Sequence, residues 1–344
     1  MASDDSLQVG FALWRDALAG LASLNLDGPM PERTSADLTA LAAQTRVICL
    51  GHCALDQTWQ VDSLLTRGNQ KIPAQGYHVV GGGMAATAAV AVARLGGRAV
   101  FWGRAGQDLA GEAMKRELVA EGVDVGGLRL IDGALSSLSA IIIDAAGERQ
   151  LVNFRGDLPD EAGWLPLHEI AGASAALVDP RWPTGALALF RAARAAGVPT
   201  VLDGDVTETD ALQHLLPLTD HAIFSENGLA QFTGLDVEDG LVRAAAFGCR
   251  ITAVTRGEAG VTWLENSALH HQPAFPVVAV NTNGAGDTFH GAYALAIGAG
   301  LGTRAAFSFA AAAAALKCAR PGTRAGIPSL ADCLAFHAAQ QVGA

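Results

Sequence analysis

The stretch Asn281 to Gly291 has the sequence NTNGAGDTFHG. It lies between an apolar run that predicts a strand, residues 275–280, and an apolar run that predicts a helix, residues 288–300. Gly284 and Gly286 let the backbone turn tightly and approach a ligand closely. The N–H groups of Gly284, Ala285 and Gly286 would be unpaired donors at the start of the helix, and such donors form an anion site. The stretch therefore predicts a strand, an anion-binding turn and a helix.

Asp287 is the unusual residue of this stretch. A carboxylate in the first helical turn can simply complement the helix dipole. Beside a bound phosphate it would repel the ligand, unless it accepts a proton from a nucleophile. Phosphoryl transfer to a hydroxyl needs both backbone donors that stabilise the transferring group and a carboxylate that accepts the hydroxyl proton. We therefore predict that Asp287 is a general base.

The spacing of the glycines excludes two common nucleotide-binding motifs. The chain has no GxxxxGK[ST] sequence, so the turn is not a Walker A loop. The next glycine after Gly286 is Gly291, so the turn is not the GxGxxG of a dinucleotide fold.

From Val47 onward, short apolar runs alternate with longer helical patterns. Strands are predicted at residues 47–53, 99–103, 175–179, 200–205, 221–226 and 251–257, and helices at 85–97, 110–122 and 184–197. This alternation favours an α/β fold, a mostly parallel central sheet with helices on both faces. Ligands of such sheets bind beyond the carboxyl ends of the strands.

Three segments depart from the alternation. Residues 1–45 read as an N-terminal helical extension, which we expect to pack on a domain spanning residues 46–344 or to mediate oligomerisation. Residues 56–81 have β character without a following helix, and residues 136–156 predict a hairpin with its turn at 144–148. We predict that these last two segments form a small β-sheet lid over the site.

Four motifs in this order carry a resemblance to a known family: GGGMAATAAVAVARLGG at 81–97, GRAGQDLAGE at 103–112, AVTRGEAGV at 253–261 and GAGD at 284–287. Together they resemble the PfkB, or ribokinase-like, carbohydrate kinases over residues 47–328. The resemblance implies an ATP-dependent sugar kinase with a three-layer α/β core and a β lid, and it implies ATP and Mg²⁺ as ligands.

The resemblance also implies roles for individual residues. Asp287 would be the base, and Gly284, Ala285 and Gly286 would form the anion hole. Residues implied to touch the sugar are Asp56, Gly82, Gly83, Thr87 and Asp108. Residues implied to lie near the nucleotide are Ser225, Glu226, Thr255, Gly257, Gly260 and Asn283. Each also has a plainer interpretation: the glycines could merely turn the chain, and Asp108 could cap the helix that follows it.

The chain departs from the family pattern in three places. Thr87 stands where the family usually has Asn, which alters one sugar contact. SENG at 225–228 replaces the usual Asn-x-x-Glu that organises magnesium and phosphates, so Glu226 would act through water or the metal would be arranged differently. Asn281 and Asn283 leave it undecided whether the chain has a monovalent-cation site.

Further segments resemble the branch of this family that phosphorylates 6-deoxy-6-sulfofructose, among them VDPRWP, QLVNFRG and NQKIPAQ. A sulfonate is a permanent anion that needs a few converging donors. Arg181, Lys71 and Asn153 could supply a planar fork, a point charge and a neutral donor. The alternative is that these are ordinary solvated or salt-bridged groups. We expect Arg149, a further cation on the lid, to be exposed at the surface.

The leading hypothesis is transfer of phosphate from ATP to the C1 hydroxyl of 6-deoxy-6-sulfofructose. The alternatives are a kinase for fructose 6-phosphate, fructose or ribose, and a non-catalytic sugar sensor on the same scaffold. The exposed edges of the lid sheet predict a homodimer through the lid. We read His270 and His271 as part of a loop rather than a metal site. His290 could tune Asp287 or simply pack.

Composition agrees with a kinase of small molecules. The chain has 344 residues and a formal net charge of −11, which favours neither nucleic acid nor anionic membranes as partners. Its five cysteines contain no CxxC pair, and the N-terminal MASDD is acidic. We expect reduced structural thiols and a cytoplasmic protein without a signal peptide.

Overall fold

The computed structural model describes residues 35–66, 71–207 and 209–342, so most of the predicted N-terminal extension lies outside the described residues. Its centre is a nine-stranded sheet in the order β13-β12-β11-β10-β9-β8-β1-β4-β5. The strands from β11 to β5 are parallel, and β12 and β13 run antiparallel at one edge. The strands are β1 (Arg46–Gly51), β4 (Arg98–Gly106), β5 (Asp124–Ile131), β8 (Ala175–Val178), β9 (Thr200–Gly204), β10 (His221–Ser225), β11 (Ile251–Thr255), β12 (Val261–Glu265) and β13 (Ala268–Gln272).

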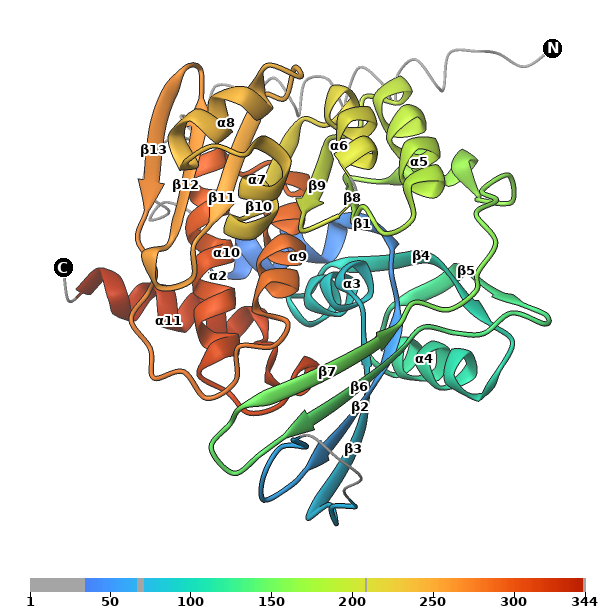
Figure 1. Ribbon diagram of the computed structural model, residues 1–344. Helices are drawn as coiled ribbons and strands as arrows, with labels where there is room; N and C mark the ends of the chain where they lie inside the picture. Colours follow the sequence, from blue (N-terminus) through green and yellow to red (C-terminus); the bar gives the residue numbers. More distant parts are fainter. Residues whose placement is uncertain (1–34, 67–70, 208, 343–344) are drawn as a thin grey trace.

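Helices cover both faces of this sheet, as predicted (Figure 1). One face carries α3 (Met84–Arg94), α9 (Ala285–Gly298) and α10 (Thr303–Cys318), with α2 (Ser35–Gln44) and α11 (Leu330–Val342) beside them. The other face carries α5 (Pro183–Ala195), α6 (Thr209–Leu215), α7 (Glu226–Thr233) and α8 (Val237–Ala245). Helix α4 (Leu109–Ala120) packs on β5 and on the small sheet. Short 3₁₀ turns occupy Leu167–Gly172, Leu216–Leu218, Gly257–Ala259 and Arg324–Gly326.

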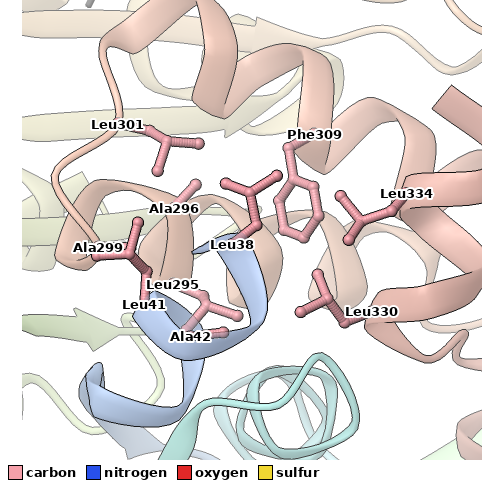
Figure 2. A pocket seen from close by; sticks show the side chains of 10 residues that line it. All are labelled: Leu38, Leu41, Ala42, Leu295, Ala296, Ala299, Leu301, Phe309, Leu330 and Leu334. Atoms are coloured by element: carbon pink, nitrogen blue, oxygen red, sulfur yellow. The ribbon is translucent and has the colours of Figure 1, made fainter. Parts of the chain in front are cut away.

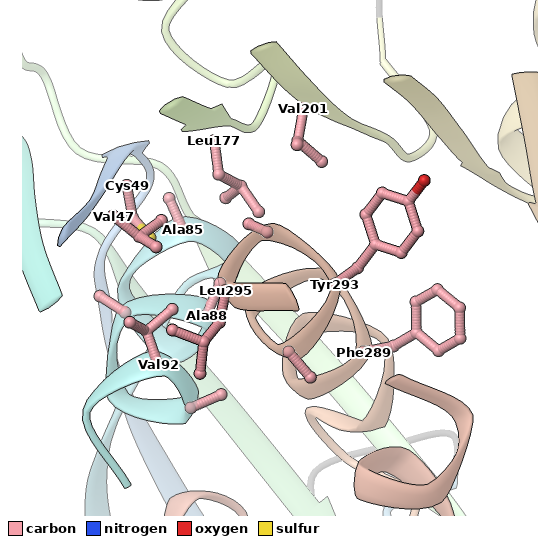
Figure 3. Close-up of a cluster of buried hydrophobic side chains, with 14 of the residues drawn as sticks. Val47, Cys49, Ala85, Ala88, Val92, Leu177, Val201, Phe289, Tyr293 and Leu295 are labelled. Atoms are coloured by element: carbon pink, nitrogen blue, oxygen red, sulfur yellow. The ribbon is translucent and has the colours of Figure 1, made fainter. Parts of the chain in front are cut away.

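Strand β1 shows why the sheet has a hydrophobic core on each side. Successive side chains of a strand point to opposite faces. Val47 and Cys49 enter the core beneath α3 and α9, which Figure 3 shows, and Ile48 and Leu50 enter the core beneath α5. A strand buried on both faces therefore reads as a continuous apolar run.

A second sheet of four strands, in the order β3-β2-β6-β7, projects from the main one (Figure 1). It consists of β2 (Ala54–Gln60), β3 (Gly76–Gly82), β6 (Leu138–Ile143) and β7 (Arg149–Phe154). Strands β6 and β7 form the predicted hairpin, in which Asp144 N–H donates to the carbonyl of Glu148. Both predicted lid segments thus contribute to one sheet.

Helix α2 packs against the domain at a small apolar pocket between α9, α10 and α11 (Figure 2). Leu38 of α2 lies beside Phe309 of α10 there, and Leu41 of α2 lies near Leu295 and Ala299 of the α9 end. The end of the predicted extension, at Ser35–Gln44, is therefore a packing helix.

Two local predictions are wrong. Residues 275–280 form no strand; instead the N–H groups of Val280 and Asn281 both donate to the carbonyl of Cys318, at 2.7 and 3.0 Å. His270 and His271 lie in strand β13 rather than in a loop, with His270 stacked on Trp263.

Within the described residues, no group of three or more His, Cys, Asp or Glu side chains could hold a metal ion. The five cysteines are free thiols. Within the same ranges, no helix is both long enough and apolar enough to span a membrane.

Candidate active site

The turn before α9 is held by its own polar groups. The side-chain oxygen Oδ1 of Asn281 accepts from the N–H of Asn283 at 2.9 Å. Gly284 adopts a left-handed conformation with φ of 75°, which explains a glycine at this position. The carbonyl of Gly284 accepts from the hydroxyl of Thr288 at 2.7 Å. The sequence TNGAGDT therefore closes a rigid turn directly onto a helix N-terminus.

The predicted set of free donors in this turn needs one correction. The N–H of Ala285 donates to the carbonyl of Thr282 at 3.2 Å, so it is not a free donor here. The N–H of Gly286 lies in the first turn of α9, where backbone donors have no intrahelical partner. An anion bound at this turn would meet that donor and the positive end of the α9 dipole.

Asp287 lies on the first turn of α9 and lines a cavity of about 310 Å³. Burial raises its pKa well above the ordinary carboxyl value, and the charges of Asp203 and Asp179 raise it further. His290 and Arg324 act in the opposite direction. A carboxyl group with a raised pKa is a better proton acceptor, so this environment suits a general base.

The cavity collects residues from distant parts of the chain. Asp56 of β2 lies opposite Ser139 of β6, and Ser139 lies opposite Asn153 of β7, so one row of the small sheet supplies three polar side chains to the cavity that Asp287 also lines. Of the sequence-predicted residues, those that line the cavity are Asp56, Gly82, Gly83, Thr87, Asn153, Arg181, Asn283, Gly284 and Asp287.

Gly82 and Gly83 are required by packing as well as by their place at the cavity. A Cβ on Gly82 would collide with the carboxylate of Asp56, and a Cβ on Gly83 would collide with the carbonyl of His52. Gly83 also has φ of 91°. Gly82 therefore allows the end of β3 to lie closely against β2, and Gly83 allows the start of α3 to lie closely against the loop after β1.

Two of the predicted substrate-binding residues do not line the cavity. Lys71 is exposed and is not among the residues that line the cavity. Asp108 caps α4: its carboxylate accepts from the N–H of Gly111 at 2.7 Å and from the N–H of Ser136 at 2.8 Å. These hydrogen bonds lower the pKa of Asp108, although desolvation acts against them. Asp108 is therefore the N-cap of α4, which is the plainer of its two predicted roles.

Several residues that line the cavity were not predicted from the sequence, among them His52, Ser139, Arg155 and Asp205. Arg155 follows Asn153 by two positions, and alternation along a strand would have placed both on one face. The positive charges of Arg181, Arg155 and Arg104 all act on His52. Burial is the main cause that lowers the pKa of His52, and these three arginines add to it. The cavity thus has a carboxylate end at Asp287 and a cationic end, which consists of Arg155 and Arg181.

Arg181 belongs to this cationic end through defined contacts. Its backbone N–H donates to Asp179 at 2.9 Å, and its guanidinium lies 3.5 Å from Asp205. Asp179 is fully buried and also accepts from the N–H groups of His52 and Ala85, at 2.7 and 3.0 Å. Asp179 therefore anchors the loop that presents Arg181.

The predicted nucleotide residues follow neighbouring strands. Ser225 at the end of β10 lies opposite Thr255 at the end of β11. The hydroxyl of Ser225 caps α7 and donates to Asp205 at 2.9 Å. Gly257 and Gly260, with φ of 53° and 80°, form the tight turn after β11. These residues share the carboxyl edge of the sheet, where ligands of α/β folds bind.

Glu226 and Asp205 are two of the carboxylates at this edge, and Asp205 also accepts from the hydroxyl of Ser225. Glu226 pairs with Arg256 at 3.2 Å, and its side chain is 55% exposed. Magnesium commonly keeps several waters and is held by one or two carboxylates together with substrate phosphates. These two side chains therefore fit a magnesium ion that arrives with a nucleotide.

Arg149 at the tip of the β6–β7 hairpin is exposed, as predicted, and also donates from its guanidinium to the side-chain oxygen of Asn283. The small sheet therefore reaches across to the turn that carries Asp287.

His290 is buried behind that turn, with Nδ1 2.8 Å from the carbonyl of Gly286 and 3.5 Å from Asp203.

Known carbohydrate kinases are similar in sequence to most of this chain. Residues 44–330 match the model of the family described as pfkB family carbohydrate kinase. A fructokinase of Klebsiella pneumoniae is 36% identical over 230 residues, which cover 60% of this chain and 74% of the fructokinase. A ribokinase of Bacillus subtilis is 27% identical over 292 residues, 83% of this chain and 97% of the ribokinase.

Solved structures share the architecture. A crystal structure from Agrobacterium tumefaciens, provisionally named a ribokinase, has a TM-score of 0.82 and 38% identity, and the match covers 87% of this chain and 99% of that one. Arabidopsis thaliana ribokinase complexed with ribose and ATP has a TM-score of 0.77 at 23% identity, with 85% and 98% covered. The predicted α/β fold class is confirmed.

Proposed function

This chain belongs to the PfkB family of carbohydrate kinases and is an ATP-dependent sugar kinase with a ribokinase-like fold, and from that premise we propose its substrate and its chemistry. The enzyme phosphorylates a ketose that carries an anionic group at the end remote from the reacting hydroxyl. The sequence indicates 6-deoxy-6-sulfofructose, phosphorylated at the C1 hydroxyl.

The observation that carries this proposal is the placement of Arg155, Arg181 and Asn153 in the same cavity as Asp287. The protein has a formal net charge of −11, so an anionic sugar needs local cations to bind. Two guanidinium groups and an amide can hold the oxygens of a sulfonate or phosphate. Lys71, exposed in the segment between β2 and β3 of the lid, approaches the anionic group when substrate is bound.

Asp287 accepts the proton of the C1 hydroxyl as that oxygen attacks the terminal phosphorus of ATP, and the bond to the ADP oxygen breaks. The N-terminal turn of α9 stabilises the charge on the transferring group. Asp56 and Ser139 bind sugar hydroxyls. Ser225, Thr255 and the Gly257–Gly260 turn bind ATP. Magnesium, held through Glu226 and Asp205, would neutralise charge on the phosphates.

The small sheet acts as a lid. Its inner row, with Asp56 and Asn153, faces the cavity, and its Arg149 contacts the catalytic turn at Asn283. Closure excludes water from the reacting groups and so limits hydrolysis of ATP.

The same sheet forms a homodimer. Its outer face carries apolar side chains that include Tyr77, Val79 and Val152, which are 53%, 45% and 70% exposed.

A neutral sugar is the second candidate, because two of the curated relatives are named fructokinase and ribokinase. In that case Arg155 and Arg181 would stabilise the fold through ion pairs, such as the 3.5 Å contact between Arg181 and Asp205, and would not bind substrate.

ADP release in the presence of ATP and magnesium, measured against 6-deoxy-6-sulfofructose, fructose 6-phosphate, fructose and ribose, tests the proposal. We expect the highest kcat/KM with the sulfosugar. A higher kcat/KM with fructose 6-phosphate would keep the role of Arg155 and Arg181, but the anionic group that they bind would be a phosphate instead of a sulfonate. Preference for fructose or ribose would contradict the role of the two arginines, and no ADP with any sugar would favour a non-catalytic sensor.

A further inference from the structure

Lys317 is a fully buried lysine at the C-terminal end of α10. The lysines of the chain are Lys71, Lys115 and Lys317, so the protein places one of its few ammonium groups in its interior. Burying an ammonium costs several kcal/mol unless other groups compensate it. The contacts of Lys317 therefore call for a functional explanation.

Those contacts all go to one residue of the catalytic loop. Lys317 Nζ donates to the main-chain oxygen of Asn281 at 2.8 Å and to its side-chain oxygen Oδ1 at 3.1 Å. The same Oδ1 accepts from the N–H of Asn283. The carbonyl of Cys318, the next residue of α10, accepts from Val280 and Asn281. The end of α10 thus holds the loop three residues before Gly284.

The charge of Lys317 also belongs to the site. Asp287 is among the groups that raise the pKa of Lys317, although burial dominates and lowers it to about 8. The ammonium form therefore prevails at neutral pH. A cation at the C-terminus of a helix is favourable because it meets the negative end of the helix dipole.

We propose that Lys317 is a tethered monovalent cation that positions the catalytic turn, so that the kinase needs no free potassium or sodium ion. The ammonium binds two oxygens of Asn281, which are the kind of ligands that a small hard cation takes. Asn281 in turn fixes Asn283 and the Gly284 turn that presents Asp287. Lys317 is therefore a positioning residue. The inference rests on the proposed role of this turn, and it resolves the monovalent-cation question that Asn281 and Asn283 leave open in the sequence.

Two substitutions separate charge from packing. Lys317→Ala removes the ammonium and leaves space, and alanine suits this alanine-rich helix. Lys317→Met fills much of the same space without charge. Lys115→Met on α4 is the control, because the structure gives it no part in the site. Turnover, ATP affinity and melting temperature are compared in ammonium, potassium and tetramethylammonium chloride at equal ionic strength.

We expect the wild type and Lys115→Met to be indifferent to the cation. Both Lys317 variants should lose turnover about tenfold to a hundredfold in tetramethylammonium, as the loss of charged hydrogen bonds implies. Ammonium or potassium should restore turnover and ATP affinity in Lys317→Ala only. The large tetramethylammonium ion cannot enter the space, and methionine blocks it.

Three results would overturn the inference: a Lys317→Met variant with wild-type turnover, a Lys317→Ala variant that ammonium and potassium do not rescue, or a wild type that requires potassium. Failure of the proposed function is distinguishable. If the wild type phosphorylates no sugar, ATP affinity and melting temperature of Lys317→Ala still report whether the cation restores the loop.

Discussion

The guanidinium of Arg324 and the carboxylate of Glu117 form an ion pair beneath the cavity, with Nη1 3.2 Å from Oε1 and Arg324 almost wholly buried. Arg324 also donates to the carbonyl of Gly82 at 2.9 Å. Glu117 accepts from the N–H of Gly81 at 2.5 Å. This pair joins the C-terminal segment, α4 and the end of β3, and so supports the glycine turn that forms the cavity wall.

Arg324→Met should therefore destabilise the protein strongly. The substitution leaves Glu117, whose side chain is 29% exposed, without its charged partner. Breaking a fully buried pair costs about 3 kcal/mol or more, and the access of Glu117 to water reduces the expected loss to about 2 kcal/mol. Denaturant unfolding measures the change in free energy. Arg320→Met is the matched control, because Arg320 pairs with Asp332 at the surface, where such pairs contribute about 1 kcal/mol or less. Equal losses in the two variants would contradict the buried pair as a support of the cavity.

Asp287→Asn should bind ATP and sugar and lose nearly all turnover. The amide keeps the shape of the carboxylate but cannot accept the hydroxyl proton, and general-base catalysis contributes about 100-fold to 10,000-fold. Calorimetric binding and ADP release measured on the same preparation separate the two effects. Turnover close to that of the wild type would exclude Asp287 as the base.

The pH dependence of kcat should show an acid limb set by Asp287. Only the ionised carboxylate can act as base, and its pKa is raised, so activity should increase with pH through a value above the ordinary carboxyl range. Asp203→Asn removes a negative charge that raises this pKa, and should move the limb to lower pH. Asp210→Asn, on the exposed side of α6, should leave the limb in place. An unmoved limb in Asp203→Asn would contradict the coupling of the two carboxyl groups.

Arg155→Gln and Arg181→Gln should each reduce kcat/KM for the anionic sugar more than for fructose. Loss of one charged hydrogen bond implies a selective decrease of about tenfold or more. The ratio of kcat/KM for the two sugars is the readout, since damage to the fold would lower both values together. Arg191→Gln, on the exposed side of α5, is the control. A uniform loss for both sugars would assign the arginines a structural role.

Val152→Lys should convert the proposed homodimer into a monomer. A charge on the outer face of the lid sheet would be buried in a dimer and is costly there. Light scattering after size exclusion gives the molar mass. Leu109→Lys changes an even more exposed apolar side chain, 91% against 70% for Val152, and should leave the mass unchanged. A monomeric wild type would refute dimer formation through this face.

Much of the fold follows from local patterns in the sequence. Apolar runs that alternate with helical patterns predicted the parallel sheet, because side chains buried on both faces of a strand must all be apolar. The GAGD turn and the 136–156 hairpin were also predicted, because glycine conformation and turn chemistry act over a few residues. The run 275–280 has the same apolar character, yet it forms no strand: its last N–H pairs with the carbonyl of Cys318 instead of a neighbouring strand.

The composition of the site was decided only by the tertiary structure. The sequence determined that Asp287 directly follows a glycine turn at a helix N-terminus, since both lie within one short stretch. It could not determine that Arg155 joins Arg181 at the cavity, that Asp108 is taken up by capping α4, or that Lys317 reaches Asn281. Such contacts depend on strand register and on the return of helices over the sheet, which bring together residues far apart in the chain. No local pattern encodes those distances, because they result from packing the whole hydrophobic core.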